Sequence, residues 1–309
     1  MFKLLPLLAF LLDLGFKDPQ GWPHPVRWIG KALVRLERLA LKQRYLSLRA
    51  AGTASLGVML LAILIFLAVV TSLPFLGPLI GLYLAYAGLA LGGLLQSARQ
   101  VLNSLELGNL EQARLELRLL VSRDTGSLDR EEISRTLAET LSENFNDGFV
   151  APMFYLCLGG PILLWLYKTV STMDSMWGYK HSHYLDLGWA GAKLDDLLAW
   201  IPARLSAGLI LIIAYFMGLE WRKAWQHSKN QARAMESPNA GWPMATAAWS
   251  LGAQMGGQAV YQGQIKQKPL LGPAGGSWGP GRLQKLLRLL LLAGCLGAGL
   301  GQLWLLLWI

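Results

Sequence analysis

The sequence predicts an all-α integral membrane protein: a bundle of about four to six membrane-embedded helices, with amphipathic and polar helical segments at the cytoplasmic face. Three observations lead to this prediction. Apolar residues make up 53% of the 309 residues and charged residues only 15%, against roughly a quarter in soluble domains. Charge-free windows of membrane-spanning length divide the chain. A crowded polar run, residues 122–148, stops abruptly at one of these windows.

Residues 1–16 are predicted to form a short N-terminal anchor. Lys3 and the apolar run after it resemble a signal peptide, but no small-residue cleavage site follows. We therefore expect this segment to be retained as part of a single membrane-embedded domain, residues 1–309.

The next segment, residues 17–49, carries eight Lys and Arg residues. Arg27, Lys31 and Arg35 are four apart with apolar residues between them, which predicts an amphipathic basic helix beside a membrane span. The positive-inside rule places this helix in the cytoplasm, where it would contact lipid headgroups. The net charge of +9 is concentrated here, so the expected partner is the lipid bilayer and not nucleic acid.

Residues 50–98 contain no charge and are interrupted by Pro74, Gly77 and Pro78. They predict a two-helix hairpin, since each half approaches the roughly 20 residues that a helical span needs. The rest of the chain is predicted as a polar cytoplasmic segment at 99–147, spans or re-entrant helices at 148–167 and 205–219, a polar Gly-rich segment at 220–288, and a C-terminal span at 289–309.

The polar run begins with Arg123 and Asp124 and continues into a predicted helix at 129–147. Asp129 with Glu132 three residues later fits a capping box, and Gly148 marks the predicted end. Helical spacing then aligns four side chains that are four residues apart, with Asn144 and Asn146 beside them. This acidic stripe consists of Arg135, Glu139, Glu143 and Asp147.

Glu139 and Glu143 are like charges one helical turn apart, which costs stability in isolation. This cost predicts a cation or a cationic ligand between them, and carboxylate and amide oxygens suit Mg²⁺. The alternative is an ordinary solvated face with an Arg–Glu pair.

Further polar clusters follow downstream. Asp174 and Lys180, in residues 172–180, are a candidate metal ligand and a candidate phosphate contact, although a helix-end loop explains them equally well. At most one of Asp195 and Asp196 shares a helix face with Arg204, and a structural ion pair is the alternative to a functional site. Ser237, Asn239 and the backbone near Gly256 and Gly257 are candidates for cradling an anionic or amide-bearing ligand, the alternative being close helix packing.

The ordered set of motifs resembles the adenosylcobinamide-phosphate synthase family of cobalamin biosynthesis. The resemblance covers about residues 13–272, and the ordered set is far more specific than any single tetrapeptide. The motifs are D-P followed by H-P-V-R-W-I-G, R-D-T, E-T-L-S-E-N-F-N-D-G-F-V-A-P, G-G-P, D-S-M-W-G-Y-K, L-D-D, I-P-A-R-L and S-P-N-A-G. The chain departs from the family pattern at Ser122, Ser171, Ala199 and Met244, which leaves the acidic stripe intact.

The resemblance implies a multi-pass enzyme of the cell (inner) membrane with a cytoplasmic active site. The implied reaction is ATP-dependent amide formation between a propionate carboxyl of adenosylcobyric acid and aminopropanol phosphate, or aminopropanol. The implied partners are the corrinoid, the small amine phosphate and other cobalamin-pathway enzymes; Mg²⁺ is the expected cofactor and ATP a co-substrate.

Residue roles are assigned as hypotheses from this chemistry. The predicted catalytic residues are Glu139, Glu143, Asp147 and Asp196. The predicted substrate- and phosphate-binding residues are Arg123, Arg135, Asn144, Lys180, Arg204, Ser237 and Asn239. The predicted metal ligands are Asp124, Glu143, Asp147, Asp174 and Asp195.

Two questions stay open at this stage. If 148–167 and 205–219 both crossed the membrane fully, residues 168–204 would lie opposite the acidic stripe, so we expect at least one of these stretches to be re-entrant or buried in the bundle. The chain also lacks a G-x-x-x-x-G-K-[ST] phosphate loop. The alternative function is therefore a non-catalytic membrane scaffold or a transporter of the corrinoid pathway.

Overall fold

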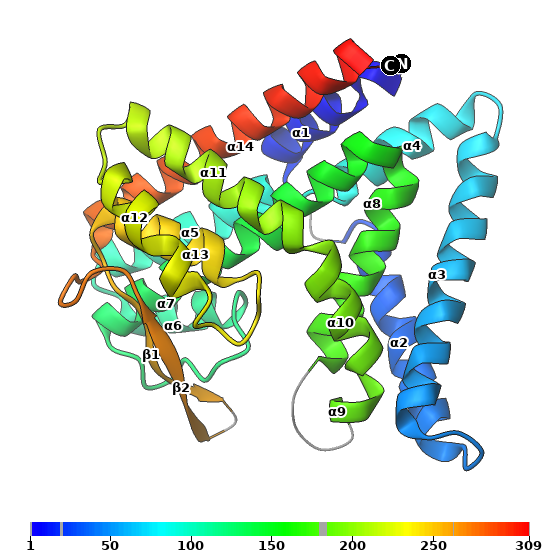
Figure 1. Ribbon diagram of the computed structural model, residues 1–309, viewed down its shortest axis with the longest axis horizontal. Helices are drawn as coiled ribbons and strands as arrows, with labels where there is room; N and C mark the ends of the chain where they lie inside the picture. The colour runs from blue at the N-terminus through cyan, green and yellow to red at the C-terminus, as the bar shows by residue number, and fades with distance from the viewer. Residues whose placement is uncertain (1, 19–20, 179–183, 262, 309) are drawn as a thin grey trace. The chain divides into compact units, whose positions relative to one another are not determined.

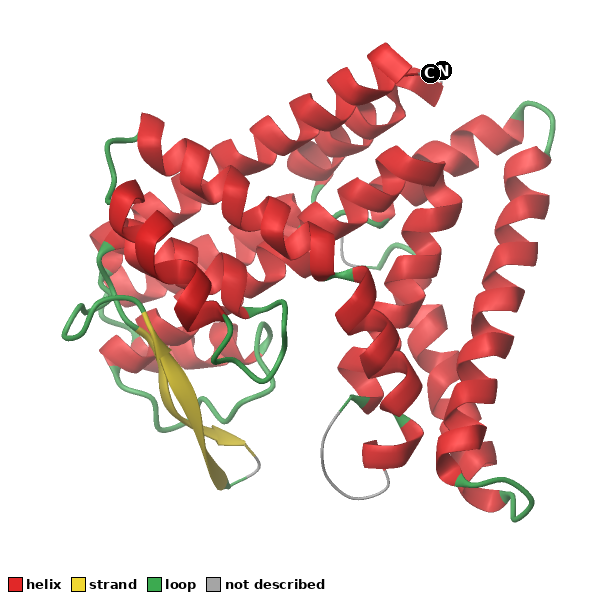
Figure 2. Cartoon of the chain, viewed as in Figure 1, coloured by secondary structure: helices red, strands yellow, loops and turns green. Residues whose placement is uncertain are grey.

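The computed structural model describes residues 2–18, 21–178, 184–261 and 263–308. Helix predominates, which confirms the predicted class, and two strands form a hairpin (Figure 2). Within the described chain, four helical stretches are long and apolar enough to cross a membrane, or five if the bent pair α10 (Trp189–Leu198) and α11 (Trp200–Phe216) counts as one span. The four are Leu48–Ser72, Leu76–Glu106, Arg130–Trp177 and Pro280–Leu307.

The chain divides into two compact units, each described by itself. Unit 1 comprises Met1–Ala90, Ala151–Ala199 and Leu300–Ile309, and unit 2 comprises Leu91–Val150 and Trp200–Gly299. Unit 1 contains η1 (Phe2–Leu4), α1 (Leu5–Phe16), α2 (Pro25–Lys42), α3 (Leu48–Ser72), α4 (Leu76–Ala87), α8 (Ala151–Trp177), α9 (Tyr184–Leu187) and α10 (Trp189–Leu198), all labelled along the ribbon except η1 (Figure 1).

Helices α3 and α4 are the two halves of the predicted hairpin, and they pack on each other and on α8. The turn between them follows Ser72, close to the predicted break at Pro74. A second interruption, after Ala87, separates α4 from α5 (Leu91–Glu106). The apolar window is therefore a hairpin whose second arm is itself broken.

Helix α2 is the predicted basic amphipathic helix. It buries Ile29 and Leu33 and leaves Arg27, Lys31 and Arg35 exposed. Since apolar and cationic residues occupy different faces, the helix has the character of an interfacial element.

Helix α8 contains a break inside the predicted 148–167 stretch. Gly159 and Gly160 have non-helical backbone angles, with a φ of 64° at Gly160, and Pro161 follows. Glycine accepts positive φ without steric cost, and proline removes a backbone donor. The apolar window is thus two helical pieces. Whether it is re-entrant stays a prediction.

Unit 2 contains α5 (Leu91–Glu106), α6 (Leu110–Arg118), α7 (Arg130–Phe145), η2 (Asn146–Val150), α11 (Trp200–Phe216), α12 (Trp221–Ala232), α13 (Gly241–Leu251), β1 (Met255–Tyr261), β2 (Gln264–Leu271) and most of α14 (Pro280–Trp308). The capping box at the start of α7 is confirmed: Asp129 accepts from the Glu132 backbone, and Glu132 accepts in return. The predicted helix end at Gly148 is wrong. The chain continues through the π-helical turn η2 into α8, because Gly148 lies inside that turn.

The antiparallel hairpin β1–β2 lies within the predicted polar segment 220–288, where no strands were expected. It has a register irregularity between Met255 and Gly257. Gly256 and Gly257 have φ values of 88° and 84°, so this irregularity depends on glycine. The two strands lack a regular alternation of apolar and polar residues. Their sequence therefore carried no clear strand signal.

Candidate functional site

A buried ion pair joins the start of the polar run to the acidic stripe. The Arg123 guanidinium pairs with Glu139 and also donates to Thr136 Oγ1 at 3.1 Å. Arg123 is 8% exposed and Glu139 only 1%. Burial alone would lower the pKa of Arg123, but the charge of Glu139 and its hydrogen bond raise it above the ordinary arginine value. The Arg123 guanidinium is therefore held in its charged form.

The same carboxylate fixes the hairpin. Glu139 Oε1 accepts a hydrogen bond of 2.8 Å from the backbone N–H of Gly256, at the start of β1. Asp124 fixes the other end: its Oδ2 accepts from Gly263 N–H at 2.8 Å, and its own N–H donates to Val260 O at 2.9 Å. Two predicted site carboxylates thus hold the hairpin against α7 and the loop before it.

Glu143 differs from Glu139. Its side chain is half-buried, and its carboxylate forms no hydrogen bond or ion pair with any described residue. The charges that act on it are attractive Lys268 on β2, repulsive Glu139 and attractive Arg123. The Tyr261 ring lies near two of these cations, with Lys268 Nζ at 5.6 Å and Arg123 Cζ at 6.0 Å from its centroid. Among the carboxylates of the acidic stripe, Glu143 is therefore the one without a hydrogen bond or ion pair to a described residue.

We call this group the α7–hairpin cluster: Arg123, Glu139, Glu143, Tyr261 and Lys268. Within the cluster, the Arg123 guanidinium pairs with Glu139, and the charge of the Lys268 ammonium acts on Glu143. The cation or cationic ligand expected between Glu139 and Glu143 stays a prediction. Tyr261 and Lys268 were not among the predicted site residues, because only the unexpected hairpin brings them to α7.

The rest of the stripe flanks this cluster. Arg135 lies beside β1, with Nη1 3.8 Å from the place where a Cβ on Gly257 would lie, and its Nε is buried without a hydrogen-bond partner in the described chain. Asp147 accepts from Asn146 Nδ2 at 2.7 Å, and Asn146 Oδ1 accepts from Ser206 Oγ at 2.9 Å. Asn144 turns back to Thr140 on its own helix.

A second group of predicted residues meets elsewhere in unit 2. Arg204 Nη1 donates to Asn239 Oδ1 at 2.9 Å, and the guanidinium lies over the rings of Trp200 and Trp242, at 4.4 and 4.6 Å from their centroids. Ser237 Oγ accepts from the backbone N–H groups of Asn239 and Ala240. The structure thus brings Arg204, Ser237 and Asn239 together, with Ser237 shaping the turn that presents Asn239.

The remaining predicted residues belong to unit 1. The ammonium of Lys193 is 3.9 Å from Asp196, in an exposed pair one turn apart. The alternative of a structural ion pair between Arg204 and one of Asp195 and Asp196 stays a prediction. Asp174 lies at the end of α8, where Asp196 is the charge that acts on it. Asp195 is on α10, and Lys180 lies outside the described residues.

Within the described residues, the predicted metal ligands are not gathered into one group. In the described parts of the chain, no group of three or more His, Cys, Asp or Glu side chains is placed to hold a metal ion. Asp124 and Asp147 each accept a hydrogen bond. These residues do not fit a protein-only Mg²⁺ cage.

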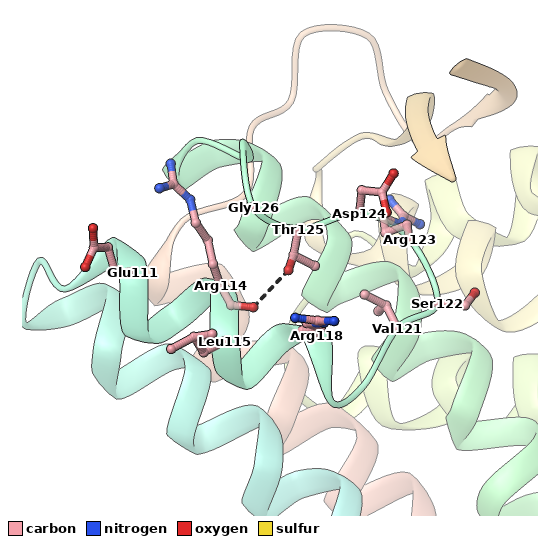
Figure 3. Close-up of a pocket in the computed structure, with 10 residues that line it drawn as sticks. All are labelled: Glu111, Arg114, Leu115, Arg118, Val121, Ser122, Arg123, Asp124, Thr125 and Gly126. Atoms are coloured by element: carbon pink, nitrogen blue, oxygen red, sulfur yellow. Dashed lines mark hydrogen bonds between the residues drawn. The ribbon is translucent and has the colours of Figure 1, made fainter. Parts of the chain in front are cut away.

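A cavity of about 680 Å³ opens between α6 and the loop that carries Arg123 (Figure 3). Its lining includes Arg114 and Arg118, which the sequence analysis did not single out. Their spacing of four residues on a short amphipathic helix was the available signal. The full lining is Glu111, Arg114, Leu115, Arg118, Val121, Ser122, Arg123, Asp124, Thr125 and Gly126.

Comparison with known proteins gives a consistent result. The family described as CobD/CbiB protein matches residues 6–290. Cobalamin biosynthesis protein CobD of Photorhabdus laumondii is 39% identical over 272 residues, covering 85% of each chain. The proteins of the same name from Pelobacter propionicus and Citrobacter koseri are 41% and 36% identical, covering 86% and 95% of this chain and 83% and 94% of their own. No solved structure matches.

Proposed function

The chain belongs to the CobD/CbiB family of cobalamin biosynthesis, and we propose that it is an ATP-dependent acid–amine ligase. The proposed reaction joins the amine of aminopropanol phosphate, or aminopropanol, to a propionate carboxyl of adenosylcobyric acid. The product is adenosylcobinamide phosphate, or adenosylcobinamide. This reaction is the one that the motif pattern implies, and the α7–hairpin cluster supplies groups suited to it.

The chemistry sets the requirements. A carboxylate and an alkylammonium do not condense in water, so the carboxylate must gain a better leaving group. In the proposed route, a carboxylate oxygen attacks the γ-phosphorus of ATP, giving an acyl phosphate and ADP. The neutral amine then attacks the acyl carbon, inorganic phosphate leaves, and the nitrogen loses a proton. The protein must supply cations for the phosphoryl group and a base for the amine.

The observation that carries this proposal is the environment of the Glu143 carboxylate. It is a half-buried carboxylate with no partner of its own in the described chain, beside Lys268 and one turn from the Arg123–Glu139 pair. A base must be free to accept a proton, and a carboxylate already locked in an ion pair is not. We therefore assign proton removal from the amine to Glu143.

The neighbouring cations fit the anionic parts of the reaction. Lys268 on β2 is the cation whose charge acts most strongly on Glu143, and Arg135 lies beside β1. We assign them to the substrate carboxylate or its phosphorylated form, since ammonium and guanidinium groups stabilise such charge. Glu139 and Asp124 have a positioning role, because their oxygens hold the hairpin that carries Lys268.

In the proposed reaction, Mg²⁺ would be bound by the phosphates of the nucleotide. It commonly keeps several waters and bridges substrate phosphates through one or two protein carboxylates. The described residues do not form a resident site, so we derive no step through a protein-held metal ion. Roles for Asp147, Asp174, Asp195, Asp196 and Lys180 stay predictions, as does association with other pathway enzymes.

The test is incubation of detergent-purified protein with adenosylcobyric acid, aminopropanol phosphate and Mg-ATP, followed by mass analysis of the corrinoid. We expect the amide product, and ATP consumption only when both corrinoid and amine are present. ATP consumption without amide formation, or no consumption at all, would favour the transporter or scaffold alternative. Residues 168–204 are predicted to lie on the cytoplasmic side together with the acidic stripe. Labelling of a Ser182→Cys variant from outside only would contradict this prediction.

A further inference from the structure

The cavity beside α6 has the composition of an anion site. It is bounded by α6 on one side and by the loop of residues 121–126 on the other (Figure 3). Its volume of about 680 Å³ falls within the usual range for small-molecule and cofactor sites. The cavity is not an apolar pocket, because charged and hydroxyl side chains form much of its lining.

Two arginines of α6 provide the positive charge. Arg114 and Arg118 are four residues apart and therefore share a face, while Ala113 and Leu117 are buried on another. Within the described ranges, neither guanidinium forms an ion pair with a carboxylate. Arg118 alone would be explained by its place at the helix C-terminus, where a cation complements the helix dipole. Arg114, in the middle of the helix, has no such explanation.

The loop is held in place by Arg114. Arg114 Nε donates to Leu128 O at 2.9 Å, and the Arg114 carbonyl accepts from Thr125 Oγ1 at 3.0 Å. The second contact is drawn in Figure 3. These bonds use Nε and leave the two terminal nitrogens of the guanidinium without a partner in the described chain. Arg114 can thus hold the loop and present two donors at the same time.

The loop adds neutral donors. The backbone N–H groups of Ser122 and Gly126 donate to no described residue, and the Ser122 hydroxyl is exposed. Phosphate oxygens accept from guanidinium groups and from loop N–H groups together. Glu111 and Asp124 lie at the edges of the cavity and reduce its net positive charge. These two carboxylates favour an anionic ligand that arrives with a bound cation.

We propose that this cavity binds the oligophosphate chain of a nucleoside triphosphate, with Arg118 and Arg114 as its cationic contacts. The identity of the nucleotide as the ATP of the ligase rests on the proposed function. The site lies on the loop that continues into Arg123, so a bound phosphate chain would contact the segment that anchors the α7–hairpin cluster.

The experiment measures binding separately from catalysis. The fluorescent analogue mant-ATP is titrated, with Mg²⁺, into the full-length protein in detergent and into Arg118→Gln, Arg114→Gln and Arg222→Gln variants. Arg222 is an exposed arginine of the same unit, on α12 outside the cavity. Loss of a charged hydrogen bond weakens binding by roughly 10-fold to 100-fold. We expect this loss for the two cavity variants only, with inorganic triphosphate competing against mant-ATP.

Unchanged mant-ATP affinity in Arg118→Gln and Arg114→Gln, or an equal loss in Arg222→Gln, would overturn the proposal. An Arg118→Lys variant that regains part of the affinity would support it, and this variant also covers the case in which Arg114→Gln fails to fold. Binding of phosphatidylglycerol in mixed micelles that needs Arg118, with no binding of mant-ATP, would make the cavity a lipid site and refute the proposal.

The two proposals fail separately. If the wild-type protein forms the amide with ATP but neither arginine substitution changes the affinity for mant-ATP, the ligase assignment stands and the proposed nucleotide site is refuted. If the arginines govern mant-ATP binding but no amide forms, the nucleotide site stands and the ligase assignment falls. In an active ligase, Arg118→Gln should raise KM for ATP more than it lowers kcat, since it removes binding common to ground and transition states.

Discussion

The carboxylate of Glu139 lies 2.8 Å from the backbone nitrogen of Gly256 and accepts its hydrogen bond. This contact joins α7 to a hairpin that follows it by more than a hundred residues. The other carboxylate oxygen pairs with buried Arg123. One side chain thus links the R-D-T loop, the acidic stripe and the strand that leads to Lys268.

We expect Glu139→Gln to destabilise the protein strongly. It leaves the Arg123 charge buried without a counter-ion, and breaking such a pair costs about 3–5 kcal/mol of unfolding free energy. The matched control is Glu220→Gln, which removes one side of the exposed Lys223–Glu220 pair and should cost less than about 1 kcal/mol. Apparent melting temperature in detergent is the measurement. Equal effects of the two substitutions would show that the buried pair is not a stabilising contact.

Glu143→Gln should separate catalysis from stability. Because Glu143 has no partner among the described residues, its neutral isostere should leave the melting temperature near that of the wild type. Loss of a general base typically lowers kcat by about 100-fold to 10,000-fold. Amide formation is followed by mass analysis under saturating substrates. A variant that keeps wild-type kcat would remove Glu143 from the proposed mechanism.

Gly256→Ala tests the hairpin anchor. Gly256 has a φ of 88°, and an added Cβ would lie 2.0 Å from Pro269 O. Strain of this kind costs of order 1–3 kcal/mol, and displacement of β1 would also weaken the contact to Glu139. The control is Gly57→Ala, a helical position with open space around it. We expect a lower melting temperature for Gly256→Ala alone, and a similar melting temperature for both variants would contradict the anchor.

The pH dependence of stability should contain a contribution from His24. Its Nδ1 accepts from Val26 N–H at the start of α2, which requires the neutral ring. Burial, together with the charges of Lys168 and Arg27, outweighs Asp18 and lowers the pKa of His24 below 6.5. The folded state therefore binds this proton more weakly than the unfolded state. The stabilisation is fully present above the unfolded pKa and is lost as pH falls through the folded pKa.

The matched variant for this prediction is His24→Asn, which keeps a capping acceptor but does not titrate. Between about pH 7.5 and pH 5.5, the melting temperature of the wild type should fall more steeply than that of the variant. Parallel curves would show that His24 does not contribute.

The basic face of α2 should respond to anionic lipid. Each exposed cation near a membrane surface contributes about 1 kcal/mol of attraction to anionic headgroups. Neutralising Arg27, Lys31 and Arg35 to Gln should therefore reduce the stabilisation by added phosphatidylglycerol, measured as a shift in melting temperature. The control neutralises Arg222, Lys223 and Lys229 on α12, the same loss of charge in another helix. Equal losses in both triple variants would indicate net charge as the cause.

Much of the fold could be predicted because its signals are local. The capping box of Asp129 and Glu132, the break after Ser72 and the basic face of α2 each depend on residues within a few turns of one another. The hairpin could not be predicted in this way. Its irregularity depends on the positive φ values of Gly256 and Gly257. In the sequence, the same glycines were also consistent with close helix packing.

The candidate site was predicted in its composition more than in its geometry. The like charges of Glu139 and Glu143 predicted a cation or a cationic ligand between them, and this binding stays a prediction. The pairing of Glu139 with the Arg123 guanidinium depends on a loop closure, and the place of Lys268 depends on the hairpin. Arg114 and Arg118 were missed because two arginines on a polar helix look like an ordinary solvated face.

The most direct test of the central claim follows the carboxyl oxygen through the reaction. Adenosylcobyric acid labelled with oxygen-18 in its free propionate carboxyl is incubated with the protein, aminopropanol phosphate and Mg-ATP, and the released inorganic phosphate is analysed by mass spectrometry. An acyl-phosphate route transfers one labelled oxygen to phosphate for each amide formed. We predict this transfer together with the amide product. Amide formation with unlabelled phosphate would contradict the proposed mechanism.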